Sequence, residues 1–572
     1  MKSVFAVPPL VIAVLAAGLI YFYPLTLGTP LLEPDEGLHA TISQEMLEHG
    51  EWIVPRFRGE PFHDKPILYF WAQMLSLAVF GMNEAAVRLP GLLFGLLGSV
   101  TCGLLAKQLF GKSTGWFATV ASMSMIIPLA LAQAAAHDVA LVPMTNLALL
   151  SLWKMEQATD RRSVIRWTAA AAVMIGLAIL TKALIGVAVI CVGFCAFLLF
   201  SRRLSISSLV RLAFAGFGGA VVASPWYIAM EIRNSGYLYY YFIERHLMGF
   251  TTSTQRHGNQ PWFYYLPWII LGASPWILHT LPLLKDRWAR RTEPAVNENN
   301  GTGAPSLQIH RQALLLVLCW LFGGVLFLSV AKSKLITYAL PLYPAVAILA
   351  AVAWQKRSDA ELSPDANLWF HRIQSYGGLF AFAVPPTALL VCGLMTGTGF
   401  PVSGWICAAA VSMICVATWK SWQAEQYRQA SAFVSLWVGG LTAVLMTWPL
   451  PYFSEDHSER PLAGWLNEHN QLPGRLSVIG ERPASVIFYL TPKLRERLNS
   501  EQLTSIDVPS LEIESADDQV THFAVREAVL QEASAAGIRV PGTECGRAGQ
   551  FVLFEVSSES AVTAETKPNI HL

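Results

Sequence analysis

Seven ionisable side chains stand out because long apolar runs surround or adjoin them. They are three aspartates and four lysines: Asp35, Asp64, Asp138, Lys65, Lys182, Lys332 and Lys334. Charge in such a setting is costly unless it meets a partner or a ligand. Lysines stabilise a developing anion such as a phosphate, and a carboxylate can accept a proton from an attacking group. The combination therefore predicts a site for an anionic ligand.

Asp35 lies in the segment LLEPDEGLHATISQEMLEHGEW. Leu38, Ile42 and Met46 recur at helical spacing, and Gly50 follows, so we expect an amphipathic helix over residues 36–49 that lies along the membrane surface. Asp35 has two interpretations. It is either the N-cap of this helix or a carboxylate directed into a cavity at the outer membrane boundary.

Asp64 and Lys65 precede Pro66 and an apolar, aromatic run over residues 67–80. One interpretation is a second surface helix, begun by the proline and anchored at the interface by its aromatic side chains. The functional interpretation adds a metal-binding carboxylate, Asp64, and a phosphate-binding lysine, Lys65.

Other polar residues join this set at the predicted outer face. Asp138 opens a predicted span, whereas Lys182 lies within an apolar stretch and either snorkels at a short turn or serves the ligand. Tyr338 follows Lys332 and Lys334 at the mouth of another span. A second outer loop adds Glu244, Arg245, His246, Arg256 and His257. Either histidine is a possible metal ligand, although a solvated loop histidine is favoured for His257.

The composition identifies the scaffold as a membrane protein. Of the 572 residues, 53% are hydrophobic and 14% are charged, against about 25% charged in soluble domains. Soluble, disordered and fibrous classes are excluded, and a net charge of +1 gives no indication of a nucleic-acid partner. The eight cysteines show no ligand spacing, so neither a disulfide framework nor a structural zinc site is expected.

About thirteen apolar segments are long enough to cross a bilayer. The first is interpreted as an uncleaved helix rather than a signal peptide. The segments lie near residues 4–27, 87–109, 113–135, 139–155, 165–181, 183–200, 208–230, 262–282, 312–331, 335–354, 374–395, 402–419 and 430–449.

The loops on one predicted side are all basic, which places them and the N-terminus in the cytoplasm. The outer side then holds loops 28–86 and 231–261, all seven residues named first, and the tail. We therefore expect a transmembrane domain over residues 1–450 and a small extracytoplasmic α/β domain over residues 451–572. In the tail we expect strands at 476–479 and 550–556, helices at 461–470 and 484–490, and a disordered last dozen residues.

These motifs match a known pattern. PDE near the end of the first span, then EML–HG–W–VPRF–GEP–HDKPILYFW and G–NE–AVRLP, resembles bacterial members of glycosyltransferase family 39. These include aminoarabinose transferases that modify lipid A, and they are related to protein O-mannosyltransferases. LTKALIG, HLMGF and SKLITYALPLYPA are similar to later segments of the family. The resemblance covers roughly residues 1–350 by motif and the rest by architecture.

The resemblance implies the GT-C membrane fold and a sugar transferase at the outer face of the inner membrane. The donor would be a polyprenyl-phosphate-linked sugar, transferred with inversion, and the acceptor lipid A, another glycolipid, a glycan or a protein. Asp35 would be the catalytic carboxylate, with Glu36 beside it and Asp138 as a second acidic position. The implied donor-site residues are Lys65, Lys182, Lys334 and Tyr338. Asp64 and His246 would hold one divalent metal ion.

The chain departs from the family pattern at three positions. Leu38 replaces the arginine of DEARY, Ile67 replaces the second proline of DKPP, and Gly249 stands where an arginine before phenylalanine is common. Two cations near the phosphate are thus missing. Candidates to replace them are Arg58, Arg245 and Arg256.

Two functions of other classes compete with the transferase. A transporter or lipid flippase would also have about twelve spans, but its charges usually lie at the midplane of repeated halves. In this chain they gather at one predicted face, and no internal repeat is evident. A scaffold with a receptor-like tail leaves the charges unexplained. The sequence therefore favours a transferase.

Overall fold

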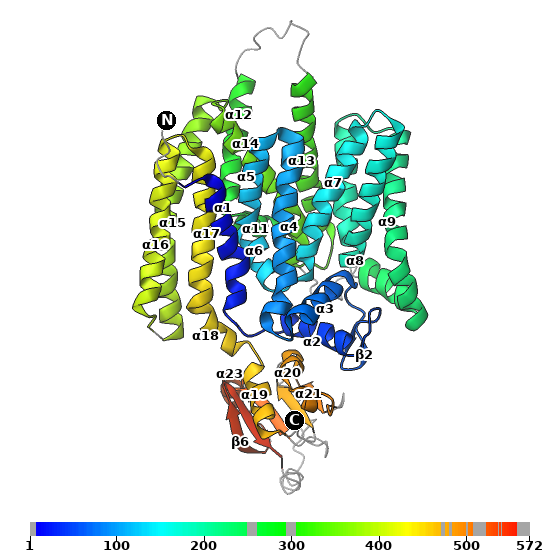
Figure 1. Ribbon diagram of the computed structural model, residues 1–572, viewed down its shortest axis with the longest axis vertical. Helices are drawn as coiled ribbons and strands as arrows, with labels where there is room; N and C mark the ends of the chain where they lie inside the picture. Colours follow the sequence, from blue (N-terminus) through cyan, green and yellow to red (C-terminus); the bar gives the residue numbers. More distant parts are fainter. Residues whose placement is uncertain are drawn as a thin grey trace, which may run out of the picture. The chain divides into compact units, whose positions relative to one another are not determined.

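The chain is built mainly from helices, as the computed structural model in Figure 1 shows. The described residues are 7–248, 260–292, 305–397, 399–470, 475–479, 483–498, 502–506, 522–535, 537–538, 540 and 542–556. Contacts divide the chain into two compact units. The first comprises Met1–Leu27, His63–Ala72 and Arg88–Pro449, and the second comprises Gly28–Phe62, Gln73–Val87 and Leu450–Leu572.

The first unit is a helical bundle. Its amino-terminal half contains α1 (Pro9–Ala17), η1 (Gly18–Phe22), η2 (Tyr23–Thr26), most of α4 (Glu84–Phe110), α5 (Lys112–Met123), α6 (Ile126–Gln133), η3 (His137–Ala140), α7 (Leu141–Gln157), α8 (Arg161–Phe200) and α9 (Ile206–Arg233). The remainder contains η4 (Tyr239–Met248), α11 (Tyr265–Gly272), η5 (Trp276–Thr280), α12 (Leu281–Thr292), α13 (Pro305–Val330), η6 (Ile336–Leu342), α14 (Tyr343–Ser358), α15 (Pro364–Thr396), α16 (Val402–Gln423) and α17 (Tyr427–Thr447).

Nine helices in the described part of the chain are long and apolar enough to cross a membrane. Two bent pairs, α5 with α6 and α11 with the helices after it, bring the number to eleven if each pair counts as one span. Helix α8 is 40 residues long and is interrupted at Lys182 and Ala183, where the backbone leaves helical geometry. The break lies at the predicted division between residues 181 and 183. Whether the two parts are separate spans, and the total of about thirteen spans, stay predictions.

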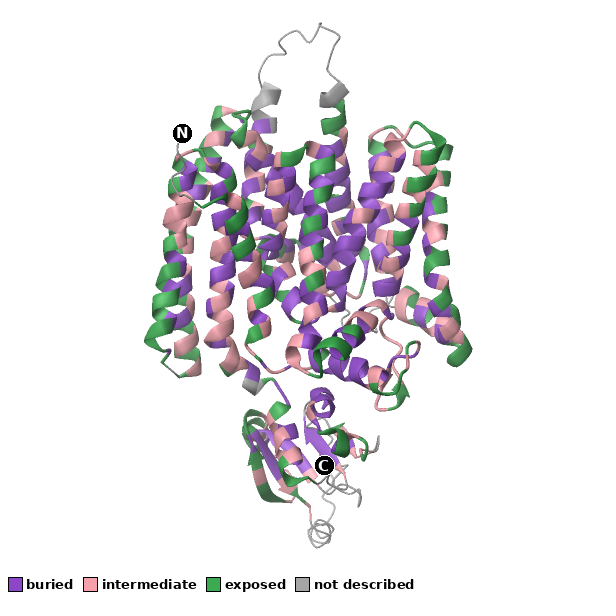
Figure 2. Cartoon of the chain, in the orientation of Figure 1, coloured by how far each residue is buried: buried purple, intermediate pink, exposed green. Residues whose placement is uncertain are grey.

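Burial differs strongly between the helices of this bundle (Figure 2). Every residue of α14 from Tyr343 to Trp354 is buried. By contrast, α15 presents large apolar side chains, such as Leu379 and Phe380, that are 71% and 75% exposed. Such a surface suits contact with lipid hydrocarbon, in which a helix satisfies its own backbone hydrogen bonds.

The second unit combines the segment before residue 87 with the tail. It contains α2 (Asp35–Glu48), the hairpin β1 (Arg56–Phe57) and β2 (Glu60–Pro61), and part of α3 (Leu68–Phe80). The tail adds α18 (Pro449–Asp456), α19 (Arg460–His469), β3 (Leu476–Ile479), α20 (Ala484–Tyr489), α21 (Pro492–Arg495), β4 (Leu503–Ile506), β5 (His522–Arg526), α23 (Glu527–Ala535), β6 (Thr543–Ala548) and β7 (Phe551–Glu555). The five tail strands form one sheet in the order β4-β3-β5-β7-β6.

Much of the predicted tail is confirmed. The sheet is parallel from β4 through β3 to β5, and β7 pairs antiparallel with both β5 and β6. Strand β3 coincides with the predicted strand, β7 lies within the second, and α19 and α20 match the predicted helices to within one residue. The last dozen residues lie outside the described part of the chain.

Two features of the predicted first outer loop differ from what the sequence led us to expect. The loop was assigned wholly to the transmembrane domain, but residues 28–62 and 73–87 group with the tail. Helix α2 is also not amphipathic, since residues 36–44 are all buried. The reason is the same in both cases: the tail covers a face of α2 that the local pattern marks as polar, and the Thr41 hydroxyl donates to the Ala484 carbonyl at 2.7 Å.

Candidate functional site

The centre of the charged site is a buried ion pair between Asp138 and Lys182. Asp138 lies in η3 and is 5% exposed, and Lys182 lies at the break in α8 and is 6% exposed. Burial alone would raise the pKa of Asp138, but the positive charges of Lys182 and Lys65 outweigh it and hold this pKa below its usual value. The carboxylate is therefore ionised and directly paired with the lysine.

Tyr338, on η6, lies beside this pair. The ammonium of Lys182 lies 4.5 Å from the centre of the Tyr338 ring, a cation–π contact. The neighbouring Thr337 hydroxyl forms a hydrogen bond with Asp138. Lys65 approaches from the loop before α3, close enough for its charge to act on both Asp138 and Tyr338. The structure thus brings together four of the predicted site residues from four separate segments: Lys65, Asp138, Lys182 and Tyr338.

Asp64 adds a second carboxylate to the first unit. Its Oδ1 accepts a hydrogen bond from the Tyr240 hydroxyl at 3.1 Å, and its Oδ2 pairs with Arg245 Nη2 at 3.2 Å. Burial and the charge of Asp64 raise the pKa of Tyr240, so its hydroxyl keeps its proton and acts as a donor. Arg245 thus lies in the predicted site, although on the carboxylate that we expected to bind a metal.

His246 is held in a defined orientation. Its Nδ1 lies 2.6 Å from the Tyr241 carbonyl, a geometry in which Nδ1 carries the proton and Nε2 has a free lone pair. Burial lowers the pKa of His246, which favours the neutral ring. A neutral imidazole with this tautomer is chemically suited to be a metal ligand or a proton acceptor.

The complete donor set does not fit the predicted metal ion. Both oxygens of Asp64 already serve a tyrosine and an arginine, and the guanidinium of Arg245 would repel a cation there. Among the described residues no group of three or more histidine, cysteine, aspartate or glutamate side chains could hold a metal. We therefore derive no chemical step from a metal ion.

Lys334 is buried but makes a different contact from the one expected. Its ammonium donates to the Gln260 carbonyl at 3.2 Å. Burial and the adjacent Lys332 lower its pKa. This contact is to a backbone carbonyl of the chain, and the donor-binding role of Lys334 stays a prediction.

The second unit holds the predicted catalytic carboxylate. Asp35 is the first residue of α2 and is exposed. The N-cap position is occupied by Pro34, the residue before it. The N-cap interpretation of Asp35 is therefore wrong, and its carboxylate is accessible. Glu36 is buried, and its Oε2 accepts the Leu32 N–H at 2.9 Å. Its observed contact is thus to the segment in front of the helix.

Arg58 forms the tip of the β1–β2 hairpin with Gly59, in the second unit. Both residues have positive φ, and Glu45 of α2 accepts both of their backbone N–H groups at 2.8 Å. This is the two-residue turn that a twisted hairpin favours. Arg58 therefore has a clear local role in shaping the turn. Two further candidates, Arg256 and His257, and the departure at Gly249 lie outside the described residues.

Sequence reasoning missed several aromatic neighbours of the site. His63 packs its ring against Tyr237 and Tyr240, and His137 lies against Tyr69 and Phe70. The rings of Tyr69 and Phe70 are buried and are not interface anchors. A signal for the tyrosines was present in the run YLYYYF over residues 237–242, directly before the charged residues of the second outer loop.

The charges of the first unit favour an anionic ligand. Lys65, Lys182 and Arg245 outnumber the carboxylates Asp64 and Asp138, and His246 is neutral. Such an excess, partly shielded from water, stabilises a phosphate more strongly than the same charges on an open surface.

An apolar groove lies elsewhere in the first unit, between the second leg of α8 and α13. Its cavity of about 560 Å³ is lined by Val192, Ala196, Phe200, Leu318, Cys319, Phe322, Gly323, Leu326, Phe327 and Val330. At one end, Val330 is two residues from Lys332 in the sequence.

Comparisons with known proteins agree with this fold. Residues 64–228 match the family model of dolichyl-phosphate-mannose-protein mannosyltransferases, a range that includes Asp64, Lys65, Asp138 and Lys182. The undecaprenyl phosphate-alpha-4-amino-4-deoxy-L-arabinose arabinosyl transferase of Erwinia tasmaniensis is 30% identical over 339 residues, 58% of this chain and 57% of that protein. The enzyme of the same name from Pectobacterium atrosepticum is 28% identical over 459 residues, 77% of this chain and 76% of that protein.

The predicted resemblance to glycosyltransferase family 39 is thereby confirmed, although the chain spans only 57% of the length of the Erwinia relative. The fold is similar to the crystal structure of ArnT from Cupriavidus metallidurans bound to undecaprenyl phosphate. The TM-score is 0.72 at 21% identity, covering 96% of this chain and 98% of that chain. This likeness confirms the GT-C membrane fold.

Proposed function

We propose that this chain is a membrane glycosyltransferase that uses a polyprenyl-phosphate-linked sugar as donor. The observation that carries the proposal is the cluster of Lys65, Lys182 and Arg245 around two carboxylates in the first unit. The matched family model and the relatives, which are named as transferases of an undecaprenyl-phosphate sugar, support the same chemistry. They favour a transferase over the alternative transporter or flippase.

In this proposal the cation cluster binds the phosphate of the donor. The bond between the anomeric carbon and the phosphate oxygen breaks, and the electron pair leaves with the phosphate. A lipid phosphate is a weak base, so its departure needs charge stabilisation more than protonation. The two lysines and Arg245 provide that stabilisation through charge-assisted contacts.

The acceptor hydroxyl needs a base, because an alcohol is a poor nucleophile. We assign this role to Asp35, whose carboxylate is exposed at the start of α2. The hydroxyl oxygen attacks the anomeric carbon opposite the phosphate, so the configuration inverts as in other single displacements. Glu36 and Asp138 then serve as supporting carboxylates.

The lipid part of the donor has an apolar path available. The groove between α8 and α13 has the composition that a prenyl chain requires. We propose that reaction occurs at the outer face of the inner membrane, with the N-terminus in the cytoplasm and the tail outside, because every predicted inner loop is basic.

The test is transfer by the purified protein in detergent. The donor is undecaprenyl phosphate-4-amino-4-deoxy-L-arabinose and the acceptor is lipid A, with mass spectrometry as the readout. We expect lipid A to gain the sugar. A protein that leaves this acceptor unmodified but releases undecaprenyl phosphate in the presence of another glycolipid, a glycan or a protein would identify a different acceptor. The absence of donor consumption with every acceptor would contradict the proposal.

The metal ion predicted from Asp64 and His246 is tested separately. Metal analysis of the purified protein decides whether an ion is bound, and transfer before and after chelation decides whether it is used. Because the proposed mechanism relies on three protein cations, we expect chelation to leave most of the activity.

A further inference from the structure

The segment that leads into Asp35 lacks regular secondary structure, yet its backbone is held at several points. It runs over residues 28–34, between η2 and α2, and contains Pro30 and Pro34, which have no N–H. A backbone N–H in such a segment needs a partner from elsewhere when it is shielded from water. Most of these partners come from the tail, the part of the chain from Leu450 onward.

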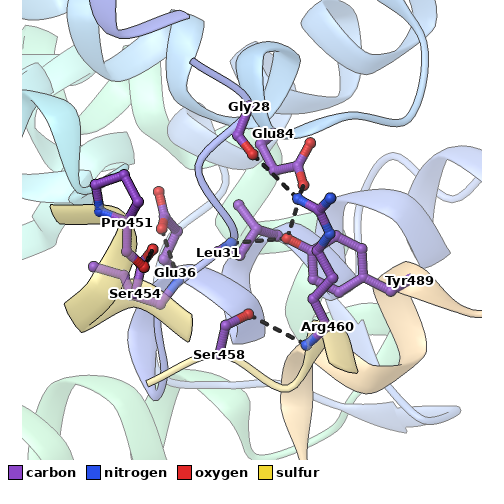
Figure 3. A network of polar contacts seen from close by, with 10 residues as sticks. Gly28, Leu31, Glu36, Glu84, Pro451, Ser454, Ser458, Arg460 and Tyr489 are labelled. Atoms are coloured by element: carbon purple, nitrogen blue, oxygen red, sulfur yellow. Dashed lines mark hydrogen bonds and ion pairs between the residues drawn. The ribbon is translucent and has the colours of Figure 1, made fainter. Parts of the chain in front are cut away.

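A ring of polar contacts holds the first half of the segment (Figure 3). Glu84 Oε1, at the start of α4, accepts the Tyr489 hydroxyl at 3.1 Å and Arg460 Nη1 at 3.3 Å. Arg460 Nη1 also donates to the Gly28 carbonyl at 3.1 Å. The Tyr489 hydroxyl accepts the Leu31 N–H at 2.7 Å, so its own proton is directed to Glu84. One ring thus holds the backbone at both Gly28 and Leu31.

The next residue bound by the tail is Glu33. Its N–H donates to the His457 carbonyl at 3.1 Å, and its Oε1 accepts the Ser485 N–H at 2.7 Å. Between Leu31 and Glu33, the Leu32 N–H donates to Glu36 of α2. Of the three consecutive N–H groups from Leu31 to Glu33, two therefore end on tail residues.

Helix α2 also approaches the tail too closely for an ordinary side chain at Gly37. A Cβ on Gly37 would lie 2.6 Å from Ser485 Cβ and would clash with Glu33 Oε1. The glycine in this chain therefore permits a contact between α2 and α20 that alanine would push apart.

We propose that the tail positions Asp35 for transfer, with Tyr489, Arg460 and Glu84 as positioning residues. They fix the segment in front of Asp35, and α20 fixes the helix that begins with it. This inference rests on the proposed function, in which Asp35 is the base. It adds that the tail is part of the transfer machinery.

Loss of one hydroxyl should disturb this arrangement without changing the donor site. Tyr489→Phe leaves the Leu31 N–H without its acceptor and Glu84 without one donor, while the aromatic ring of residue 489 keeps its shape. A misplacement of about 1 Å at a reacting group costs up to ~100-fold in rate. The proposed phosphate-binding residues all belong to the first unit, so donor affinity should not change.

The matched control is Glu48→Gln, which weakens a contact between the tail and the other end of α2. Glu48 Oε1 pairs with Arg495 Nη2 at 2.6 Å. It lies 13 residues after Asp35, about 20 Å along the helix. The control therefore weakens the attachment of the tail to α2 but leaves the segment before Asp35 intact.

The experiment measures kcat and KM with undecaprenyl phosphate-4-amino-4-deoxy-L-arabinose and lipid A, hydrogen–deuterium exchange of peptides over residues 28–34, and the melting temperature. For Tyr489→Phe we expect kcat to fall about tenfold and KM to change less than about twofold, with faster exchange in this segment. Glu84→Gln, which keeps an acceptor oxygen, should lose less. Glu48→Gln should keep the kcat of the wild type.

Each contrary outcome has a distinct meaning. A Tyr489→Phe variant with normal kcat overturns the positioning role while leaving the proposed function intact. Equal losses in Tyr489→Phe and Glu48→Gln also overturn it, because they would reflect general weakening of the tail. A wild-type protein that transfers nothing contradicts the proposed function itself. If hydrogen–deuterium exchange over residues 28–34 is unchanged in Tyr489→Phe, the positioning role of Tyr489 is overturned whatever the activity.

Discussion

Burial of the Asp138–Lys182 ion pair carries a desolvation free energy that stability alone does not explain. Removing two charges from water costs several kcal/mol per ion, and an apolar pair of similar volume is often as stable or more so. The nearby charge of Lys65 and the ring of Tyr338 make the arrangement more elaborate than a structural pair requires. A role in holding a phosphate explains why a cation is kept there.

Breaking this pair separates stability from function. Lys182→Met or Asp138→Asn alone should lower the free energy of unfolding by about 3–5 kcal/mol, because the other charge stays buried without its partner. The double variant should recover much of the melting temperature but not the transfer activity. An active double variant would show that the pair is only structural.

Lys65 is expected to act on the donor through its charge. Lys65→Ala should weaken donor binding by about tenfold or more, whereas Lys65→Arg should keep part of it, because a cation is retained with different geometry. Titration of the purified protein with undecaprenyl phosphate measures this directly. Equal affinities of the wild type and Lys65→Ala would remove Lys65 from the phosphate site.

At the scale of single elements, local sequence patterns predicted the position of the break in α8 but not the burial of α2. The break in α8 lies where the apolar run over residues 165–200 was divided into two predicted spans. The ion pair of Lys182 was not predictable, since its partner Asp138 lies 44 residues earlier in the sequence, in η3. Snorkelling and ion pairing look identical in a local sequence.

Helix α2 shows the opposite case. Its periodicity indicated one apolar face, but residues 36–44 are all buried. The polar side is covered by tail residues such as Ala484 and Ser485, more than 440 positions away. No sequence window around α2 contains this information, which is why the prediction of an amphipathic helix was wrong.

The break in α8 gives a prediction at this scale. Ala183 has φ 45° and ψ −125°, a region that costs a non-glycine residue about 1–3 kcal/mol. Ala183→Gly should therefore leave the melting temperature close to that of the wild type and retain activity.

The matched control is Ala178→Gly, at an equally buried position where α8 is regular. Loss of helix propensity there costs about 1 kcal/mol, to which the lost packing adds. Ala178→Gly should thus lower the melting temperature more than Ala183→Gly does. The reverse order would argue against the positive φ at Ala183.

At the scale of the whole molecule, residues far apart in sequence make up the charged site. Lys65, Asp138, Lys182, Tyr338 and Arg245 come from separate segments of the first unit. Their shared predicted side followed from the basic loops, and most of their roles followed from motif resemblance. Their individual partners, such as Arg245 on Asp64, depend on packing and could not be derived.

The topology of the whole chain can be measured with reporters. After residue 460, a reporter enzyme that works only outside the cytoplasm should be active. In the 283–311 loop, a reporter that works only in the cytoplasm should be active. The physical reason is the retention of lysine- and arginine-rich loops on the inner side. Cytoplasmic activity after residue 460 would contradict a one-sided outer site.

The central claim, that the chain transfers a sugar with Asp35 as base, is tested most directly by Asp35→Asn. The amide keeps nearly the shape of the carboxylate but cannot accept the acceptor's proton. We measure transfer from the polyprenyl-phosphate sugar together with donor binding and the melting temperature. The account predicts a loss of about 10²–10⁴-fold in rate, with donor affinity and melting temperature unchanged. Near-normal transfer by Asp35→Asn would contradict it.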